Sequence, residues 1–242
     1  MPSSTDTLTG RVTEHADMET MTAELATCVI ADLEAALEVR GKAVLAVSGG
    51  STPADLYRTL SQAPIDWARI TVLLVDERWV PPDAPGSNER FVRETLLQGP
   101  ASAARLAGLK TPAASPFDAV ETLQPDIAAL GPPDVVILGM GADGHTASWF
   151  PHARGLDEAL APDGAAIAAI EARPSAVTGD HLQRMTLTRA TLARAGRLVL
   201  MMRGADKRAA LEAALGAGDV ADMPVRALLR AGSLPLDIHW TA

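Results

Sequence analysis

Four short runs of apolar residues constrain the fold of this chain more than any other feature of its sequence. They cover residues 43–47, 70–75, 135–138 and 198–202, and none shows the strict alternation of a strand with one face in water. Each run is also too short for a helix of ordinary length. Strands buried on both faces are typical of parallel sheets covered by helices. The runs therefore predict an α/β fold with a parallel sheet.

Helical patterns between the runs supply the predicted cover. Between residues 18 and 40, apolar side chains recur at spacings of three, four and seven, which predicts a helix that Gly41 ends. Shorter helical patterns lie at residues 54–60, 89–97, 117–130 and 206–215. Gly and Pro cluster only in short connectors, without a long linker or a repeat. We therefore expect a single domain over residues 1–242, a three-layer, Rossmann-like parallel sheet flanked by helices.

Composition and charge exclude several classes of partner. The chain has 242 residues, a formal net charge of −9 and 3% aromatic residues, so it would repel a phosphate backbone and has few rings to stack on bases. No uncharged apolar run reaches the ~18 residues of a membrane span. A lone cysteine, Cys28, falls in the first helical pattern, where we expect it to be packed. We expect a cytoplasmic monomer or small homo-oligomer that binds neither nucleic acid nor membrane.

The carboxyl ends of the strands are where open parallel sheets bind ligands. After the first run, residues 48–53 read Ser-Gly-Gly-Ser-Thr-Pro and precede a helix. Free backbone amides, two hydroxyls and the positive end of a helix dipole favour phosphate binding. The candidate residues are Gly49, Gly50, Ser51 and Thr52. Two alternatives stay open: an ordinary turn in which Ser51 or Thr52 caps the helix, and a serine nucleophile at Ser48, which lies in an imperfect nucleophile elbow.

Three charged residues, Asp76-Glu77-Arg78, follow the second run directly. Burying an unpaired charge costs free energy. A charge cluster directly after a buried strand is therefore either mutually paired or takes part in binding or catalysis. Arg78 keeps its charge at any ordinary pH and is suited to stabilising an oxyanion. We expect Asp76 to contact the substrate. The alternative is a solvated surface turn.

A glycine-rich loop follows the third run at residues 139–151 and contains the pattern G-x-G-x-x-G. Pro151 comes too early for the long helix that packs behind those glycines in a dinucleotide-binding unit. The loop carries Asp143 and His145, and a carboxylate beside an imidazole can orient it as a general base. A metal site made by these two residues with His152 is an alternative. Because no second spaced pair of ligands exists, we expect no metal and no cofactor.

Two cations lie around the fourth run. Lys207 falls in the first turn of the following helix, where a positive charge opposes the helix dipole unless an anion offsets it. Arg184 precedes a short strand-like run at residues 185–188 and could supply a second cation. The alternative for this arginine is a solvated surface residue. We expect both side chains to hold an anionic group of the substrate.

These segments together resemble the 6-phosphogluconolactonases. The resemblance runs from the first helix to about Leu215, and its motifs are residues 48–53, 76–81 with 87–88, 139–151 and 184–207. It implies a parallel sheet flanked by helices, related to the fold of the glucosamine-6-phosphate deaminases. It also implies hydrolysis of 6-phospho-D-glucono-1,5-lactone to 6-phosphogluconate without a metal or cofactor. That reaction is the second step of the oxidative pentose phosphate pathway.

The resemblance further implies roles for single residues. His145 matches the base of the family, and Arg78 matches its arginine. The turn at residues 49–52, Arg184 and Lys207 match positions that hold the phosphate in this family or in the related deaminases.

Two other functions are compatible with the same motifs. An aminosugar-phosphate isomerase or deaminase on this fold would use an aspartate base, and Asp76 occupies a comparable strand end. Arg78 and the Thr-Ala-Ser run after His145 favour the lactonase. A sugar-phosphate-sensing regulator would keep the pocket without the chemistry, but the chain lacks a basic helix-turn-helix extension. Trp149 departs from the lactonase pattern, in which leucine is commoner, and would change a wall of the pocket.

Overall fold

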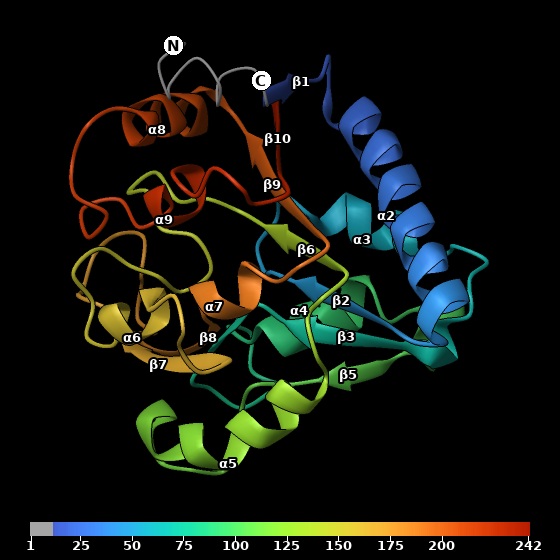
Figure 1. Cartoon of the computed structure of the whole chain (residues 1–242), viewed down its shortest axis with the longest axis horizontal. Helices are drawn as coiled ribbons and strands as arrows, with labels where there is room; N and C mark the ends of the chain where they lie inside the picture. Colours follow the sequence, from blue (N-terminus) through green and yellow to red (C-terminus); the bar gives the residue numbers. More distant parts are fainter. Residues whose placement is uncertain (1–11) are drawn as a thin grey trace.

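A large, fully parallel sheet runs through the molecule in the computed structural model, which describes residues 12–242 (Figure 1). In spatial order its strands are β1 (Val12–Glu14), β10 (Leu236–Thr241), β9 (Arg197–Arg203), β6 (Val135–Leu138), β2 (Ala43–Val47), β3 (Ile70–Leu74) and β5 (Arg105–Ala107). The four predicted runs are the adjacent strands β9, β6, β2 and β3. Because these strands are parallel, their carboxyl ends meet at one edge of the sheet.

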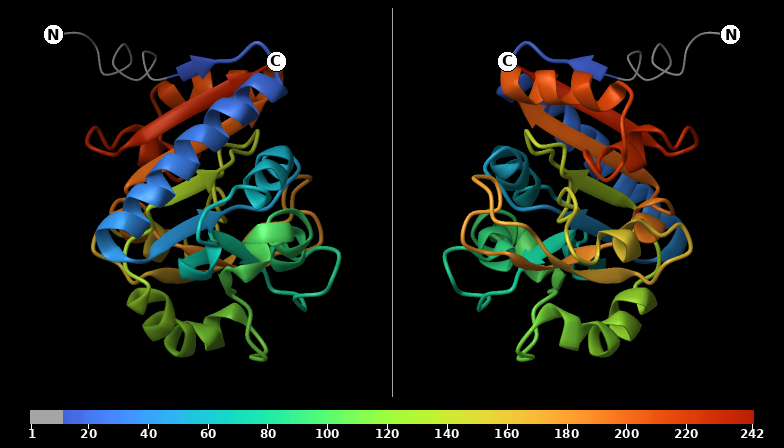
Figure 2. Two further views of the ribbon diagram at one scale, coloured as in Figure 1. Left: turned by 90° about the vertical axis from the view of Figure 1, so that its right-hand side faces the viewer. Right: turned by 90° about the vertical axis from the view of Figure 1, so that its left-hand side faces the viewer.

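Helices cover both faces of this sheet, as predicted. Figure 2 shows α2 in front of the sheet in one view and α8 in front of it in the other. The helices are α2 (Met18–Arg40), α3 (Ala54–Ser61), α4 (Asn88–Thr95), α5 (Pro116–Ala129), α6 (Leu156–Leu160), α7 (Arg189–Leu192), α8 (Ala205–Leu215) and α9 (Arg226–Leu229), with short 3₁₀ turns at Trp67–Arg69 and Gly99–Ala103. Among the described residues, no helix has the length and apolarity to cross a membrane.

The first helix shows how local sequence sets element boundaries. The Asp17 side chain accepts a hydrogen bond from the backbone N–H of Thr20 at 2.8 Å and so caps the start of α2. Gly41 ends the helix with φ +73°, a conformation that glycine adopts without steric cost. The prediction that Cys28 is packed is wrong. It lies on the exposed side of α2, and the buried stripe runs through Leu25 and Val29 instead.

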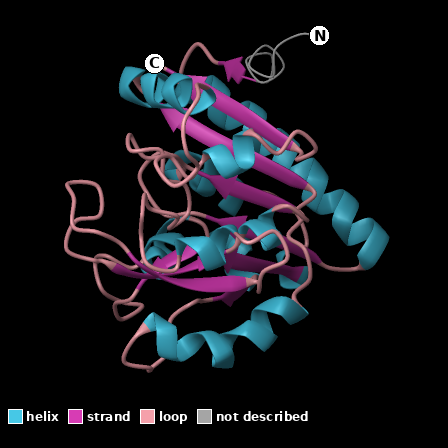
Figure 3. Ribbon diagram, turned by 60° about the vertical axis from the view of Figure 1, so that its left-hand side comes forward, coloured by secondary structure: helices cyan, strands magenta, loops and turns pink. Residues whose placement is uncertain are grey.

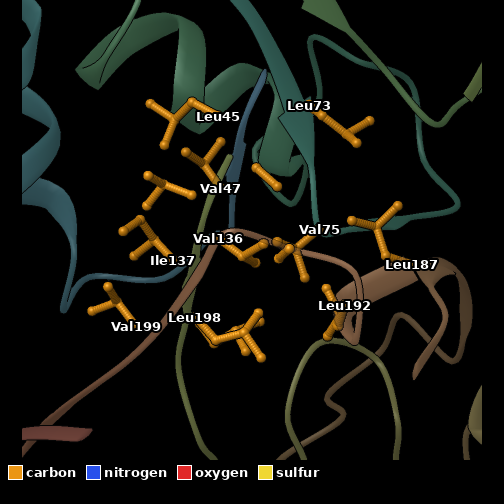
Figure 4. Close-up of a cluster of buried hydrophobic side chains, with 14 of the residues drawn as sticks. Leu45, Val47, Leu73, Val75, Val136, Ile137, Leu187, Leu192, Leu198 and Val199 are labelled. Carbon is orange, nitrogen blue, oxygen red and sulfur yellow. The ribbon is translucent and has the colours of Figure 1, made fainter. Parts of the chain in front are cut away.

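Branched aliphatic side chains fill the centre of the molecule (Figure 4). Every residue of β2 and β6 is buried, which explains why these runs lack polar alternation. Leu45 and Val47 from β2 and Val136 and Ile137 from β6 belong to this core. Burying each such side chain contributes about 1.5–3 kcal/mol relative to leaving it in water. A core of this kind needs few rings, in agreement with the low aromatic content.

A second, antiparallel sheet lies beside the large one and was not predicted (Figure 3). Its strands, in spatial order, are β4 (Asp76–Arg78), β8 (Gln183–Leu187) and β7 (Ile167–Glu171). The chain passes from β3 into β4 at Val75. The N–H of Val75 donates to the carbonyl of Val47 at 2.9 Å, and its own carbonyl accepts from the N–H of Leu187 at 2.8 Å. The charged segment after the second run is therefore a strand, not a surface turn.

Candidate active site

A cavity of about 330 Å³ opens where the carboxyl ends of the central strands meet. The predicted site residues that line it are Gly49, Gly50, Ser51, Thr52, Asp76, Arg78, His145, Arg184 and Lys207. Asp143 lies behind this lining and contacts His145. The structure thus brings together residues that are up to 158 positions apart in the sequence, from Gly49 to Lys207.

The glycine turn after β2 passes close to the start of α4. A Cβ atom on Gly49 would lie 1.9 Å from Oδ1 of Asn88, so only glycine fits here. Gly50 has φ +100°, which is strained for any residue with a side chain. These two glycines let the backbone of the turn face the cavity without side-chain cover, as binding an anion requires.

The hydroxyl groups of this turn do not cap α3. The N-cap position is Pro53 and makes no side-chain hydrogen bond, so the alternative of a cap at Ser51 or Thr52 is wrong. Both hydroxyls lack a hydrogen-bond partner within the described chain and lie at the cavity. Ser48 is buried, and its hydroxyl donates to the carbonyl of Ile137 at 2.9 Å, which does not suit a nucleophile.

Asp76 presents a carboxylate to the cavity and is fixed from behind. Its Oδ2 accepts a hydrogen bond from the Ser148 hydroxyl at 2.5 Å, and its Oδ1 accepts one from Nδ2 of Asn88 at 3.1 Å. All three side chains are buried. A carboxylate held in this way can accept a hydrogen bond from a sugar hydroxyl with little reorganisation.

Two arginines face each other across the second sheet. Arg78 on β4 and Arg184 on β8 are register partners, so their side chains leave the same face, and both line the cavity. Like charges directly opposite one another are destabilising unless an anion lies between them. Burial lowers the pKa of Arg184 to about 10, with Asp76 opposing the shift and Arg78 adding to it. Arg184 therefore remains charged at neutral pH.

The donor groups of the two arginines are only partly used. Nη1 of Arg78 donates to the carbonyl of Gly86 at 2.6 Å, whereas its buried Nε has no partner in the described chain. Arg184 donates through Nε to the carbonyl of His181 and through Nη2 to that of Thr178. The guanidinium groups are thus held in place by protein carbonyls and keep donors for a ligand.

His145 has a carboxylate partner on one ring nitrogen. Its Nδ1 lies 2.6 Å from Oδ1 of Asp143, and the same oxygen accepts the backbone N–H of His145 at 3.1 Å. The ring packs against Phe150, with centroids 4.5 Å apart. A Cβ on Gly141 would lie 2.1 Å from Nδ1, so the glycine loop leaves room for the imidazole. With Nδ1 donating to the carboxylate, Nε2 carries the lone pair that a general base needs.

The charge state of Asp143 suits this orienting role. Its carboxyl is partly buried, which disfavours ionisation, but the hydrogen bond and charge interaction with His145 outweigh that effect. The pKa of Asp143 is consequently held below its usual range. The residue stays ionised at neutral pH and accepts from Nδ1–H.

Two cations lie at the carboxyl end of β9. Lys207, in the first turn of α8, lines the cavity, and its ammonium lies 4.0 Å from Oδ2 of Asp206. Arg203, the last residue of β9, also lines it and was not predicted as a site residue. The sequence signal for Arg203 is its position directly after the apolar run 198–202, at the start of the segment that contains Lys207.

Known proteins match this chain over most of its length. Residues 16–240 match the family model described as glucosamine-6-phosphate isomerases/6-phosphogluconolactonase. The chain belongs to this family. A 6-phosphogluconolactonase of Rhizobium meliloti is 45% identical over 218 residues, which are 89% of this chain and 92% of the relative. One of Pseudomonas aeruginosa is 48% identical over 217 residues, 89% of this chain and 88% of the relative.

Solved structures show the same fold in this family. A 6-phosphogluconolactonase from Shewanella baltica superposes with a TM-score of 0.90 at 38% identity, covering 96% of this chain and 97% of that one. A monomeric glucosamine-6-phosphate deaminase has a TM-score of 0.76 at 18% identity, covering 96% and 97%. The second likeness concerns the fold alone.

The structure corrects one sequence expectation and one alternative about neighbouring residues. Trp149 does not form a wall of the pocket: it is fully buried, and its indole N–H donates to the carbonyl of Leu187 at 2.9 Å. His152 does not join Asp143 and His145, because its Nε2 pairs with Asp222 at 2.9 Å. In the described part of the chain, no three His, Cys, Asp or Glu side chains gather as metal ligands would.

Proposed function

We propose that this chain is a 6-phosphogluconolactonase, which hydrolyses 6-phospho-D-glucono-1,5-lactone to 6-phospho-D-gluconate. The observation that carries the proposal is that His145, oriented by Asp143, faces the same cavity as Arg78 and Arg184. A lactone is an activated ester, so its hydrolysis needs an activated water, a stabilised oxyanion and a hold on the substrate. The cavity offers a side chain for each need.

In the proposed reaction, Nε2 of His145 takes a proton from a water molecule as its oxygen attacks the carbonyl carbon of the lactone. The tetrahedral oxyanion that forms accepts hydrogen bonds from the guanidinium group of Arg78, which lines the cavity. The bond between the carbonyl carbon and the ring oxygen then breaks. The imidazolium returns its proton to that oxygen, which leaves as a hydroxyl. The carboxylic acid that forms loses its proton to solvent to give 6-phospho-D-gluconate, and the protein ends the cycle in its starting protonation state.

The phosphate is proposed to lie between the glycine turn at residues 49–52, Arg184 and Lys207. The turn at residues 49–52, with two hydroxyls that lack partners in the described chain, and the two cations all line the cavity. Asp76, fixed by Ser148 and Asn88, is proposed to bind a sugar hydroxyl. We further propose a cytoplasmic location, from the sequence features given above.

Hydrolysis of freshly prepared 6-phosphogluconolactone, corrected for the spontaneous rate, tests the function. His145→Asn is expected to lower kcat by about 10²–10⁴-fold, because a general base contributes that much, while KM changes far less. His152→Asn is the matched control, since this exposed histidine pairs with Asp222 outside the cavity, and it is expected to keep kcat within about twofold.

Two outcomes contradict the proposal. Parent-like hydrolysis by His145→Asn would show that another group acts as the base. Release of ammonia from glucosamine 6-phosphate by the parent protein, without lactone hydrolysis, would favour the isomerase or deaminase reaction of the same family.

A further inference from the structure

The carboxylate of Glu77 lies beneath the active site, outside the cavity. Successive side chains of a strand point to opposite faces, so Asp76 and Arg78 face the cavity while Glu77 points away from it. Glu77 has no exposed surface. Burying a carboxylate costs free energy unless hydrogen bonds satisfy it. The groups that donate to Glu77 therefore indicate its structural role.

Four donors converge on this carboxylate. Oε1 accepts the backbone N–H groups of Arg78 at 2.6 Å and Asn88 at 2.8 Å. Oε2 accepts the Ser87 hydroxyl at 2.9 Å and the backbone N–H of Glu89 at 2.8 Å. Within residues 12–242 no cation forms a salt bridge with Glu77, and its hydrogen bonds all come from the start of α4 and from strand β4.

Capping of α4 explains only part of these bonds: Glu77 satisfies the free N–H groups of Asn88 and Glu89 in the first turn of the helix, but its bond from the N–H of Arg78 lies on β4. The helix already has a side-chain cap, because the Ser87 hydroxyl oxygen accepts the N–H of Arg90 at 3.2 Å. The hydrogen bonds of Glu77 also connect β4 to the start of α4, and residues 79–87 form the loop between these two elements. The two ends of this connection, Arg78 and Asn88, are the residues next to the reaction.

Both ends act on groups that line the cavity. The backbone N–H of Arg78 donates to Glu77, and its Nη1 donates to the carbonyl of Gly86, which directly precedes Ser87. The Nδ2 group of Asn88 donates to the backbone carbonyl of Asp76 at 2.8 Å and to its side chain. The other side of the same amide packs against Gly49 in the turn at residues 49–52, called the phosphate turn below.

We propose that Glu77 is a positioning residue, whose carboxylate fixes Arg78 relative to Asp76 and to the phosphate turn at residues 49–52. The inference rests on the proposed lactonase function, in which Arg78 stabilises the oxyanion. A misplacement of about 1 Å in such a group is enough to cost about 100-fold in rate. Glu77 itself touches no substrate.

Glu77→Gln keeps the size of the side chain but places an NH₂ group against N–H and O–H donors. Its kcat on 6-phosphogluconolactone is expected to fall about 10–100-fold with KM within about threefold, because the groups proposed to hold the phosphate are not moved far. In the Arg78→Ala background the same change is expected to lower kcat by less than about threefold further. Residues that act through one another are non-additive in this way.

A stability control separates positioning from general damage. Leu33→Ala removes a buried side chain of α2 far from the cavity and is expected to lower the melting temperature while leaving kcat unchanged. If Glu77→Gln does not fold, Ser87→Ala takes its place, because it removes one of the four donors and leaves the carboxylate intact. Its kcat is expected to fall about 3–10-fold.

Additive losses in the double variant, or a raised KM with parent kcat, would overturn the proposal. A crystal structure of Glu77→Gln tests it independently of the reaction. There, the Nη1 contact of Arg78 with Gly86 is expected to be lost or divided between conformers. An unmoved Arg78 would refute the positioning role even if the parent protein proved to have another activity, whereas absence of lactone hydrolysis by the parent would refute only the proposed function.

Discussion

At the scale of single residues, the Asp143 carboxylate links stability to pH. Its pKa in the folded protein is lowered, against about 3.9 in an unfolded chain, by the His145 interactions that outweigh burial. Its stabilising contribution is therefore fully present above pH ~4 and lost as pH falls through the lower, folded value. Asp143→Asn is expected to reduce the free energy of unfolding by about 1–2 kcal/mol at pH 7, and this deficit should be smaller at pH 3.

Urea unfolding of the parent and the variant at both pH values measures this difference. Asp222→Asn is the matched control, because Asp222 also pairs with a histidine but is more than half exposed. This substitution should leave the free energy of unfolding nearly unchanged at both pH values. A deficit for Asp143→Asn that persists unchanged at pH 3 would contradict the ionised hydrogen bond.

Lys207 is expected to act on binding and not on the chemical step. Charge-assisted contacts contribute roughly 1.5–3 kcal/mol, so Lys207→Ala should raise KM for the phosphorylated lactone about tenfold or more with little change in kcat. Unphosphorylated gluconolactone should be hydrolysed equally by parent and variant. Lys42→Ala removes a lysine outside the cavity and should change neither constant; an unchanged KM in Lys207→Ala would remove this lysine from the site.

The candidate site residues could be identified from sequence because most follow buried strands directly. The turn at 49–52, Arg78 and Lys207 all fall within a few positions of a strand end, where topology alone places them at one edge. Glu77 and Asn88 could not be assigned roles in this way. Their contribution depends on contacts between β4 and α4 that no local pattern encodes.

At the scale of elements, the contact between the phosphate turn and α4 makes a steric prediction. In Gly49→Ala the new Cβ would lie 1.9 Å from Asn88 Oδ1, and the Asn88 side chain cannot retreat because Asp76 holds it. The turn must shift instead, so KM is expected to rise at least tenfold. Gly232→Ala, where the added Cβ meets nothing within 4 Å, is the matched control and should have parent kinetics. Parent KM in Gly49→Ala would contradict a phosphate site at this turn.

The second sheet could not be predicted from the sequence. Its strand β4 has three residues, all of them charged, and pairs with β8 more than 100 positions further along the chain. The outer strand β1 is equally short and is recognisable only by its pairing with β10. Long helices and fully buried strands carry their signal in local periodicity, whereas these strands are set by tertiary pairing.

At the scale of the whole molecule, ligand binding should stabilise the fold, because the cavity is assembled from segments of both sheets. The product 6-phosphogluconate at 100 times its Kd should add about 2.7 kcal/mol, which corresponds to a rise in Tm of about 5–10 °C for a chain of this length. Thermal melts measure the shift. At the same concentration of 6-phosphogluconate, the Tm of Lys207→Ala should rise by about half as much. Gluconate should raise the Tm of the parent protein very little, and an equal rise with gluconate would contradict phosphate recognition.

The crossing at Val75 has a consequence for protein engineering. One residue hydrogen-bonds to the large sheet through its N–H and to the second sheet through its carbonyl. The histidine follows a strand of the first sheet and the two arginines belong to the second, so this junction sets the spacing between them. There is no linker to lengthen there, and an insertion would break both sheets. Directed evolution toward larger lactones must therefore work through side chains and the outer loops, with the spacing of the reacting groups left as it is.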